Sequence, residues 1–203
     1  MQSKYQITNI YQRALTLTEI LVAVVVLSIG LLGMAGIQMK GLRGTHNTFL
    51  RSQATALATD LAERIRANPS GISLAVSSST NTNYSMVNFS ESTDCSTAPT
   101  SCGSINGNAA TTDCTTAQIA AYDIYTWMCG SSGTDTINGV RNILPAATTA
   151  TTTCTTDSDT TDSDGCSPGS TINITVNWDE RALDTEGNAQ AVNPQSLTMV
   201  VVP

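Results

Sequence analysis

The chain has 203 residues and a hydrophobic content of 40%, which predicts one modest domain with an additional element rather than two ordinary domains. Its charged fraction is only 12% and its formal net charge is -7. These values leave no broad basic surface of the kind that nucleic-acid binding requires, so we expect no nucleic-acid partner.

A long apolar segment begins near residue 15. From Ile20 to Ile37 about 18 residues carry no charge, which is close to the shortest helix that spans a bilayer. A signal peptide is the alternative, but its apolar core is usually shorter and is followed by non-helical sequence. Here an amphipathic helical pattern follows, ended by Pro69. We therefore expect one transmembrane and assembly helix over 15–68, with its second half using Leu42, Phe49, Ala54, Leu57, Ala58, Leu61 and Ile65 as the apolar face.

Glu19 lies inside the apolar segment, near one end. An ionised carboxylate at the bilayer centre costs about 2.5 to 3.5 kcal/mol on insertion scales, so such a residue indicates a functional site with a partner. No Lys or Arg follows within helical reach before Lys40. Small residues at the junction indicate a helix-packing face, a place where the helix melts, or an ordinary anchor that tolerates them; they are Gly30, Gly33, Gly36, Gly41 and Gly44.

The residues RALTLTEILVAVVVLSIGLLGMAG resemble the processing signal of type IV prepilins and pseudopilins. The resemblance implies a leader peptide over residues 1–14, cut by a prepilin peptidase between Ala14 and Leu15, and N-methylation at Leu15. Glu19 is then the fifth mature residue, and the resemblance implies that its carboxylate meets the N-terminal amine of Leu15 on a neighbouring subunit. Such a pair gives the buried charge a partner only in the assembly. Ala14 stands where the family usually has glycine, and Leu15 where it usually has phenylalanine.

A narrower resemblance is to the minor pilins of the PilV group, the type IV pilus modification proteins. It rests on LVAVVVLSIGLLGMAGIQMKGLR and FLRSQATALATDLAERIRANP. It implies a minor pilin that assembles with other minor pilins and the major pilin to prime or cap the type IV pilus, in support of adhesion or twitching motility. The inner-membrane assembly platform is an implied partner, as is the lipid bilayer before assembly. A pseudopilin of a type II secretion system and an uncut single-pass membrane adhesin or sensor are the alternatives.

Charged residues cluster at the end of the predicted helix. Asp60, Glu63, Arg64 and Arg66 lie on one helix face, where they form either a solvated face with weak local pairs or part of a functional surface.

The 6 cysteines all follow Pro69 in polar sequence, and an even count there predicts disulfides formed outside the reducing cytosol. Structural zinc is the alternative, but no C-x-x-C pair is present. We expect a disulfide-containing periplasmic head over 69–203 on a single-pass inner-membrane anchor, later exposed on the fibre at the cell surface. Of the 15 possible connectivities, we predict the local one, which pairs Cys95 with Cys102, Cys114 with Cys129, and Cys154 with Cys166.

The head sequence predicts an amphipathic helix over 117–128 and two antiparallel strands, over 171–178 and 196–202, joined by a turn-prone segment around 184–194. The fold class is therefore α+β and pilin-like, a long N-terminal helix packed on a small antiparallel sheet.

Features of catalysis and metal binding are weak. His46 is the only histidine, and no G-x-S-x-G elbow or phosphate-binding loop is present, so we expect no enzyme and no cofactor. An acidic tract invites a calcium interpretation, but it does not fit the EF-hand spacing, and a solvated acidic loop is favoured for Asp157, Asp159, Asp162 and Asp164.

Overall fold

The computed structural model describes residues 16–72, 82–102, 113–130, 139–145, 148–157, 159, 166–182 and 191–203. The chain divides into two compact units, Met1–His46 and Asn47–Pro203. The predicted leader and Leu15 lie outside the described residues, as do Asp162 and Asp164.

Helix α1 (Leu17–Ala67) contributes to both units. It ends at Asn68, which precedes Pro69 and has the non-helical dihedral angles φ -137° and ψ 67°. A 3-10 turn, η1 (Pro69–Gly71), follows at once. A Cβ atom on Gly71 would lie 2.7 Å from the Tyr84 ring and 2.9 Å from the Cβ of Ala120, so only glycine fits this close approach.

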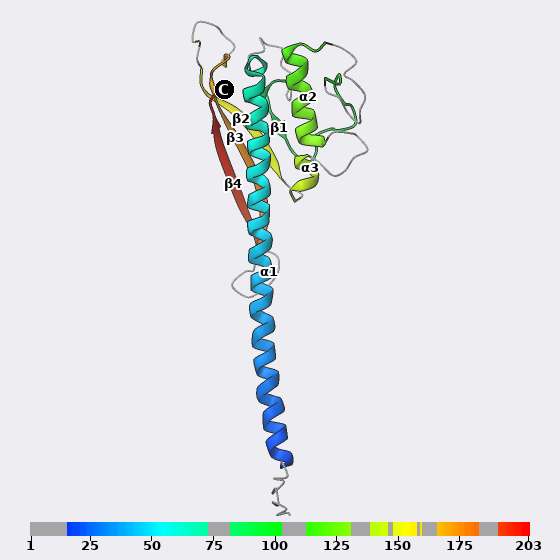
Figure 1. Ribbon diagram of the computed structural model, residues 1–203, viewed down its shortest axis with the longest axis vertical. Coiled ribbons are helices and arrows are strands. Elements are labelled where there is room, and N and C mark those ends of the chain that lie inside the picture. Colours follow the sequence, from blue (N-terminus) through cyan, green and yellow to red (C-terminus); the bar gives the residue numbers. More distant parts are fainter. Residues whose placement is uncertain are drawn as a thin grey trace, which may run out of the picture. The chain divides into compact units, whose positions relative to one another are not determined.

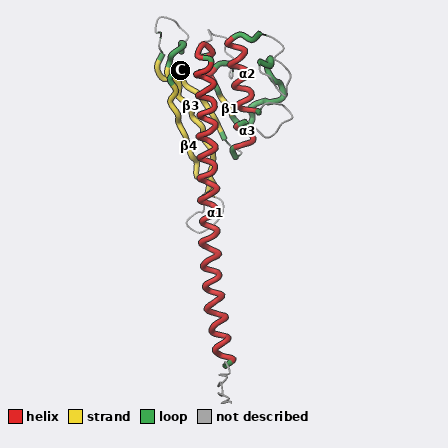
Figure 2. Tube along the Cα trace, in the orientation of Figure 1, coloured by secondary structure: helices red, strands yellow, loops and turns green. Residues whose placement is uncertain are grey.

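The second unit contains the remaining elements (Figures 1 and 2). They are η2 (Tyr84–Met86), β1 (Asn88–Phe89), α2 (Thr116–Cys129), α3 (Val140–Ile143), β2 (Thr149–Thr156), β3 (Thr171–Ala182) and β4 (Ala191–Val201). Within the described part of the chain, the sheet is antiparallel with the order β1-β2-β3-β4. The predicted α+β architecture is thereby confirmed.

Strands β3 and β4 confirm the two predicted strands and their antiparallel pairing. The register runs from Ile172 opposite Val201 to Ala182 opposite Ala191. The predicted turn, however, extended too far, because Pro194 lies within β4 opposite Asp179. Proline is tolerated there because β4 is an edge strand, where a residue without an N–H group need not break the ladder.

Strand β2 was not predicted from the sequence. Its inward residues include Ala150 and Thr152, which give little apolar contrast with the outward threonines. Thr152 is buried because its hydroxyl group donates to the Tyr84 carbonyl at 2.6 Å and accepts from the Val87 N–H at 2.9 Å. Thr152 can therefore occupy a core position, because its hydroxyl group has both a donor and an acceptor partner.

The hydrophobic core of the second unit lies between the end of α1, the sheet and α2. The buried side chains of α1 are Leu50, Ala54, Leu57, Ala58, Leu61, Ala62 and Ile65. Two of the predicted apolar-face residues are absent from this set, because Leu42 and Phe49 are exposed. At 100° per residue, Phe49 projects from the side of the helix opposite the centre of the buried set.

Both ends of helix α2 carry residues that stop the helix. At the start, the Thr115 hydroxyl accepts from the Gln118 N–H at 3.3 Å and the Gln118 side chain accepts from the Thr115 N–H at 2.9 Å, which is a capping box. At the end, Gly130 adopts φ 87°, which favours glycine. The helix predicted over 117–128 is confirmed.

All six cysteines form disulfides, but two of the three predicted pairs are wrong. The pairs are Cys95–Cys129, Cys102–Cys114 and Cys154–Cys166. Cys114 and Cys129 stand at opposite ends of α2, roughly 20 Å apart at 1.5 Å per residue, whereas a disulfide needs Cα atoms within about 7 Å. Cys95 meets Cys129 because its carbonyl accepts from the hydroxyl of Tyr125, one helical turn before Cys129, at 2.9 Å.

Candidate functional site

Among the described residues of the first unit, the apolar part of α1 has no packing partner. Every residue from Thr16 to Leu42 is exposed, although the segment contains many large apolar side chains. The helix is long and apolar enough to cross a bilayer. A Cβ atom added at any of the five glycines from Gly30 to Gly44 would meet nothing within 4 Å, so packing inside the chain does not require them.

Glu19 lies in the first turn of α1 and is exposed. Its backbone N–H donates to the Thr16 carbonyl at 3.0 Å. Among the residues that the structure describes, no cation lies within ion-pair distance of its carboxylate. The predicted cleavage residues, Ala14 and Leu15, are outside the described part of the chain.

A buried carboxylate of the sheet pairs with Arg51, in the part of α1 that belongs to the second unit. Glu180 on β3 is only 3% exposed, and it accepts from the Arg51 Nε at 3.1 Å. Arg51 also donates to the side-chain oxygen of Gln195 on β4 at 2.6 Å. Because removing one partner of a buried ion pair leaves an uncompensated charge, Arg51 fixes the position of β3 and β4 against α1.

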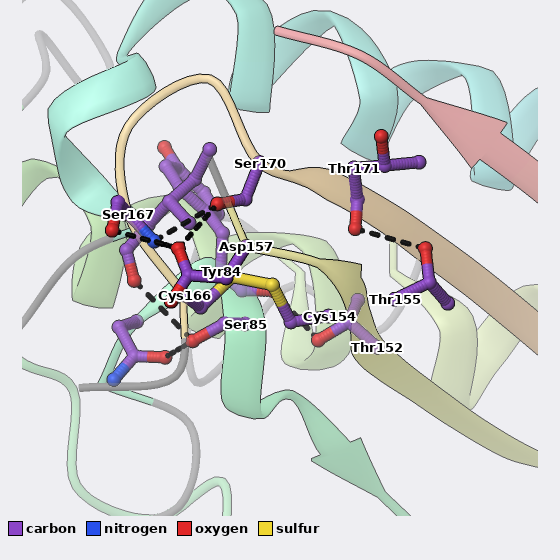
Figure 3. Close-up of a disulfide and its surroundings, with 12 residues drawn as sticks. Tyr84, Ser85, Thr152, Cys154, Thr155, Asp157, Cys166, Ser167, Ser170 and Thr171 are labelled. Atoms are coloured by element: carbon purple, nitrogen blue, oxygen red, sulfur yellow. Dashed lines mark hydrogen bonds between the residues drawn. A yellow bond between two sulfur atoms is a disulfide. The ribbon is translucent and has the colours of Figure 1, made fainter. Parts of the chain in front are cut away.

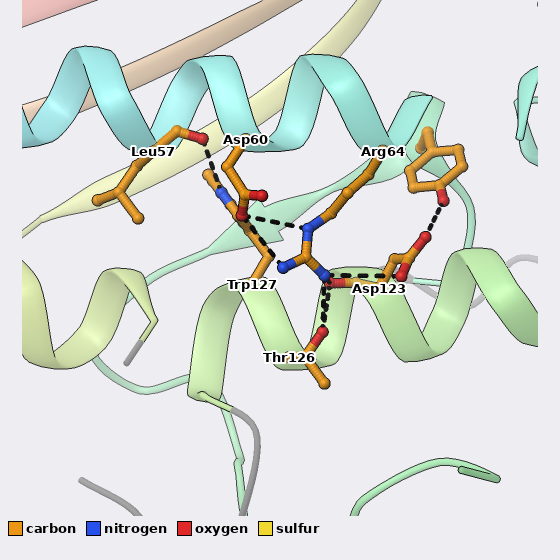
Figure 4. A network of polar contacts seen from close by, with 7 residues as sticks. Leu57, Asp60, Arg64, Asp123, Thr126 and Trp127 are labelled. Carbon is orange, nitrogen blue, oxygen red and sulfur yellow. Dashed lines mark hydrogen bonds and ion pairs between the residues drawn. The ribbon is translucent and has the colours of Figure 1, made fainter. Parts of the chain in front are cut away.

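A second polar network joins α1 to α2 (Figure 4). The guanidinium group of Arg64 contacts the Asp60 carboxylate at 3.1 Å, the Thr126 hydroxyl at 2.8 Å and the Asp123 carbonyl at 3.1 Å. The Asp123 carboxylate lies 3.6 Å from Arg64 and accepts from the Tyr84 hydroxyl at 2.5 Å. Burial of Tyr84 raises the pKa of its hydroxyl well above the usual value, and the Asp123 charge acts in the same direction.

The sequence alone could not distinguish an exposed local charge pair on this helix face from a pair that also contacts α2. Arg66 and Glu63 form the exposed local pair at 2.6 Å that a solvated face predicts. Asp60 and Arg64 also form a local pair, but Arg64 extends the network to α2.

The base of the loop closed by Cys154–Cys166 is built around Asp157 (Figure 3). One carboxylate oxygen of Asp157 accepts from the Ser167 hydroxyl at 2.8 Å, the Ser167 N–H at 3.0 Å, the Asp159 N–H at 3.1 Å and the Ser170 hydroxyl at 3.2 Å. The hydrogen bond from the Ser167 side chain lowers the pKa of Asp157, and those from the Asp159 and Ser167 backbones and from the Ser170 side chain add to it, whereas partial desolvation opposes them. Asp157 is thus a structural acceptor, and no cluster of potential metal ligands occurs among the described residues.

Two family models match the chain. The first, the prokaryotic N-terminal methylation motif, covers residues 10–35 and therefore includes Ala14, Leu15 and Glu19. The second, described as type IV pilin Tt1218, covers residues 36–125. The chain is similar to type IV pilins. The pilin match runs through the second part of α1 and into α2, so it includes Phe49, Asp60, Arg64 and Asp123 but ends before Thr126. No curated protein and no solved structure matches the chain.

Proposed function

We propose that this chain is a minor pilin of a type IV pilus, of the PilV group, which assembles with other minor pilins and the major pilin to prime or cap the fibre. The observation that carries the proposal is the methylation motif over 10–35, which overlaps an apolar segment whose side chains are exposed from Thr16 to Leu42. An exposed apolar helix of this length requires lipid or other helices around it.

During assembly, the apolar helix then leaves the lipid bilayer and packs among the helices of other subunits in the fibre. The prepilin peptidase removes residues 1–14, and the helix over 15–68 holds the subunit in the inner membrane with the head over 69–203 in the periplasm. On transfer to the fibre by the assembly platform, the carboxylate of Glu19 pairs with the amine of Leu15 on a neighbour. This pair supplies the cation that the described residues of the chain itself do not provide, and it specifies the register between subunits.

The head acts as a structural and presenting unit rather than as an enzyme. Three disulfides and the contacts of Arg51 and Arg64 join the described elements of the second unit, which suits a subunit exposed outside the cell. The similarity to a pilin supports a structural role, and adhesion or twitching motility would be the activity of the assembled fibre.

The test is to follow an affinity-tagged chain in cells that carry both pili and a type II secretion system. We expect the chain in sheared pilus fibres, at a low ratio to the major pilin, and absent from them when the prepilin peptidase gene is deleted. Recovery with the secretion-system pseudopilins instead would identify a pseudopilin. A chain that stays in the membrane while normal fibres are sheared away would contradict the proposal and indicate an uncut anchor.

A further inference from the structure

Strand β4 is a long open edge of the sheet. In the described part of the chain, the order β1-β2-β3-β4 leaves two edges, which are β1 with 2 residues and β4 with 11. Figure 1 shows β4 at the outer side of the sheet. An edge strand presents a row of unpaired backbone N–H and C=O groups, and proteins usually keep such strands short or protect them with proline or charge. The edge at β1 is short, so the question concerns β4.

Pro194 indicates which backbone groups of β4 face outward. Proline has no N–H group to give to a ladder, and the register between β3 and β4 is unbroken, so the backbone at Pro194 is turned away from β3. In agreement, its carbonyl accepts from the Gln195 side chain at 3.2 Å. Ser196, Thr198 and Val200 follow at steps of two, and alternate residues of a strand turn their backbone groups to the same edge. Their N–H and C=O groups therefore face outward, in a part of β4 that carries neither proline nor charge.

The side chains along this edge indicate what kind of strand fits beside it. Leu197 and Met199 pack against the core but are only partly buried at its margin. On the opposite face of β4, the side chain of Val200 is 60% exposed. Side chains directly opposite each other on neighbouring strands lie about 4.5 to 5.5 Å apart, so one further strand would cover both faces of this edge. The edge therefore fits an extended segment with apolar residues facing the core and β-branched residues facing outward.

A second copy of this chain does not supply such a segment. Its described edge at β1 is too short to cover β4. Two β4 strands paired about a two-fold axis run antiparallel. Such a pairing would also reverse the second part of α1, which belongs to the same unit and lies along β4 in Figure 1. Subunits that are anchored in one membrane hold these helices parallel, so the occupant of the edge belongs to a different subunit.

We propose that the edge of β4 from Ser196 to Val201 pairs with an extended strand of a different pilin subunit, so that one sheet continues from one head to the next. The inference rests on the proposed function, because its partner is one of the subunits with which a minor pilin assembles. It goes further by naming the surface and the mode of contact. In strand addition, main-chain hydrogen bonds supply affinity, and alternating side chains supply specificity.

The experiment is photo-cross-linking of the full-length tagged chain, with Val200→p-benzoylphenylalanine, in native membranes and sheared fibres. We expect ultraviolet light to join the chain to a different pilin subunit, and mass spectrometry to place the bond in an extended segment of that subunit. The matched control is the same photoreactive residue at Thr151. It lies on β2 between Asn88 and Thr175, within the sheet, and should give no such bond.

A proline tests the backbone pairing itself. Thr198→Pro removes one outward N–H group and places a ring at the edge, but it spares the ladder to β3 as Pro194 does. The cross-linking yield from position 200 should fall at least about fivefold, while thermal unfolding of the head stays close to that of the wild type. Thr198→Val is the matched control, because it loses the hydroxyl that contacts Thr175 at 3.3 Å but keeps the N–H group. Ser196→Pro, at an equivalent position, takes the place of Thr198→Pro if that variant does not fold.

An unchanged yield from position 200 in a folded proline variant would overturn the inference, and so would bonds that join only two copies of this chain. The photoreactive residue at Leu27 separates the inference from the proposed function. Cross-links from Leu27 to another pilin, with none from Val200, would remove the edge contact and leave the pilin function intact. If neither position forms a bond to any pilin, the proposed function fails as well.

Discussion

The two parts of helix α1 differ in where their apolar side chains find a partner. From Leu50 to Ile65, α1 buries seven side chains against the sheet and α2. From Thr16 to Leu42, every residue is exposed. One part therefore contributes to the folding of the head, whereas the other can contribute only in lipid or in an assembly. A substitution should accordingly damage either stability or assembly, depending on which part it falls in.

The largest effect is expected at Glu19, on assembly alone. If its carboxylate pairs with a neighbour's amine, Glu19→Ala should lower the amount of chain in sheared fibres at least about tenfold. Each 1.4 kcal/mol is a factor of ten, and removing one partner of a buried ion pair costs about 3 to 5 kcal/mol because the other charge is left uncompensated. Membrane insertion and the unfolding of the head should not change. Glu19→Gln is the matched control for side-chain volume, and normal piliation in Glu19→Ala would argue against the assigned pair.

The stabilisation that each disulfide gives should increase with the length of chain it closes. The chain-entropy model gives about 4 kcal/mol for Cys95–Cys129, with a sequence separation of 34, and about 3 kcal/mol for Cys102–Cys114, with a separation of 12. Replacing each pair by alanines and measuring urea unfolding of the head would test the order. Equal losses for both pairs would show that local strain or residual structure outweighs loop length.

Replacing a leucine by alanine should destabilise the head in one part of α1 and leave its stability unchanged in the other. Leu61→Ala removes a fully buried side chain and should lower the free energy of unfolding of the head by about 2 to 5 kcal/mol. Leu27→Ala, at a position that is 65% exposed, should leave it unchanged. Denaturation of both full-length variants in the same detergent gives the comparison, and a loss of head stability in Leu27→Ala would show that the two parts are not independent.

The partly buried network of Tyr84, Asp123 and Arg64 should contribute a smaller amount to the free energy of unfolding. Tyr84→Phe removes the hydroxyl that donates to Asp123 while keeping the ring, and hydrogen bonds to charged groups are worth about 1.5 to 3 kcal/mol. Thermal unfolding of the variant and the wild type would measure this loss. The exposed pair offers the control, because Glu63→Gln should change the free energy of unfolding by less than about 0.5 kcal/mol.

The smallest effect concerns pH. Asp157 has a lowered pKa in the folded state, so its stabilising contribution is present above the unfolded value of about 3.9 and is lost as the pH falls through the folded pKa. The difference in stability between the wild type and Asp157→Asn should therefore shrink as the pH falls below the unfolded value of about 3.9. A difference that is constant over this range would show that the hydrogen bonds do not depend on the charge.

The sequence predicted those features that a local pattern encodes. The end of α1 follows from Pro69, the helix over 117–128 from its amphipathic pattern, and β3 and β4 from alternating β-branched residues. The disulfide pairs depend on which cysteines the fold brings to each end of α2, and this has no local signal. The predicted helix over 117–128 was nevertheless enough to rule out Cys114–Cys129, because these two cysteines flank it at opposite ends.

Other features had no local signal. Strand β2 presents threonine on both faces, and its inward Thr152 is recognisable only once Tyr84 and Val87 are placed beside it. The Arg64 network joins residues that are 59 and 62 positions apart. For the candidate assembly site, the motif supplied Glu19, while the partner that we propose for Glu19 belongs to another molecule.

The most direct measurement is the N-terminal sequence and intact mass of the chain from membranes of cells with and without the prepilin peptidase. The account predicts a chain that begins at Leu15, with an N-methylated amine, only when the peptidase is present. A chain that begins at Met1 in both strains, or one cut after Gly36 or beyond, would contradict it.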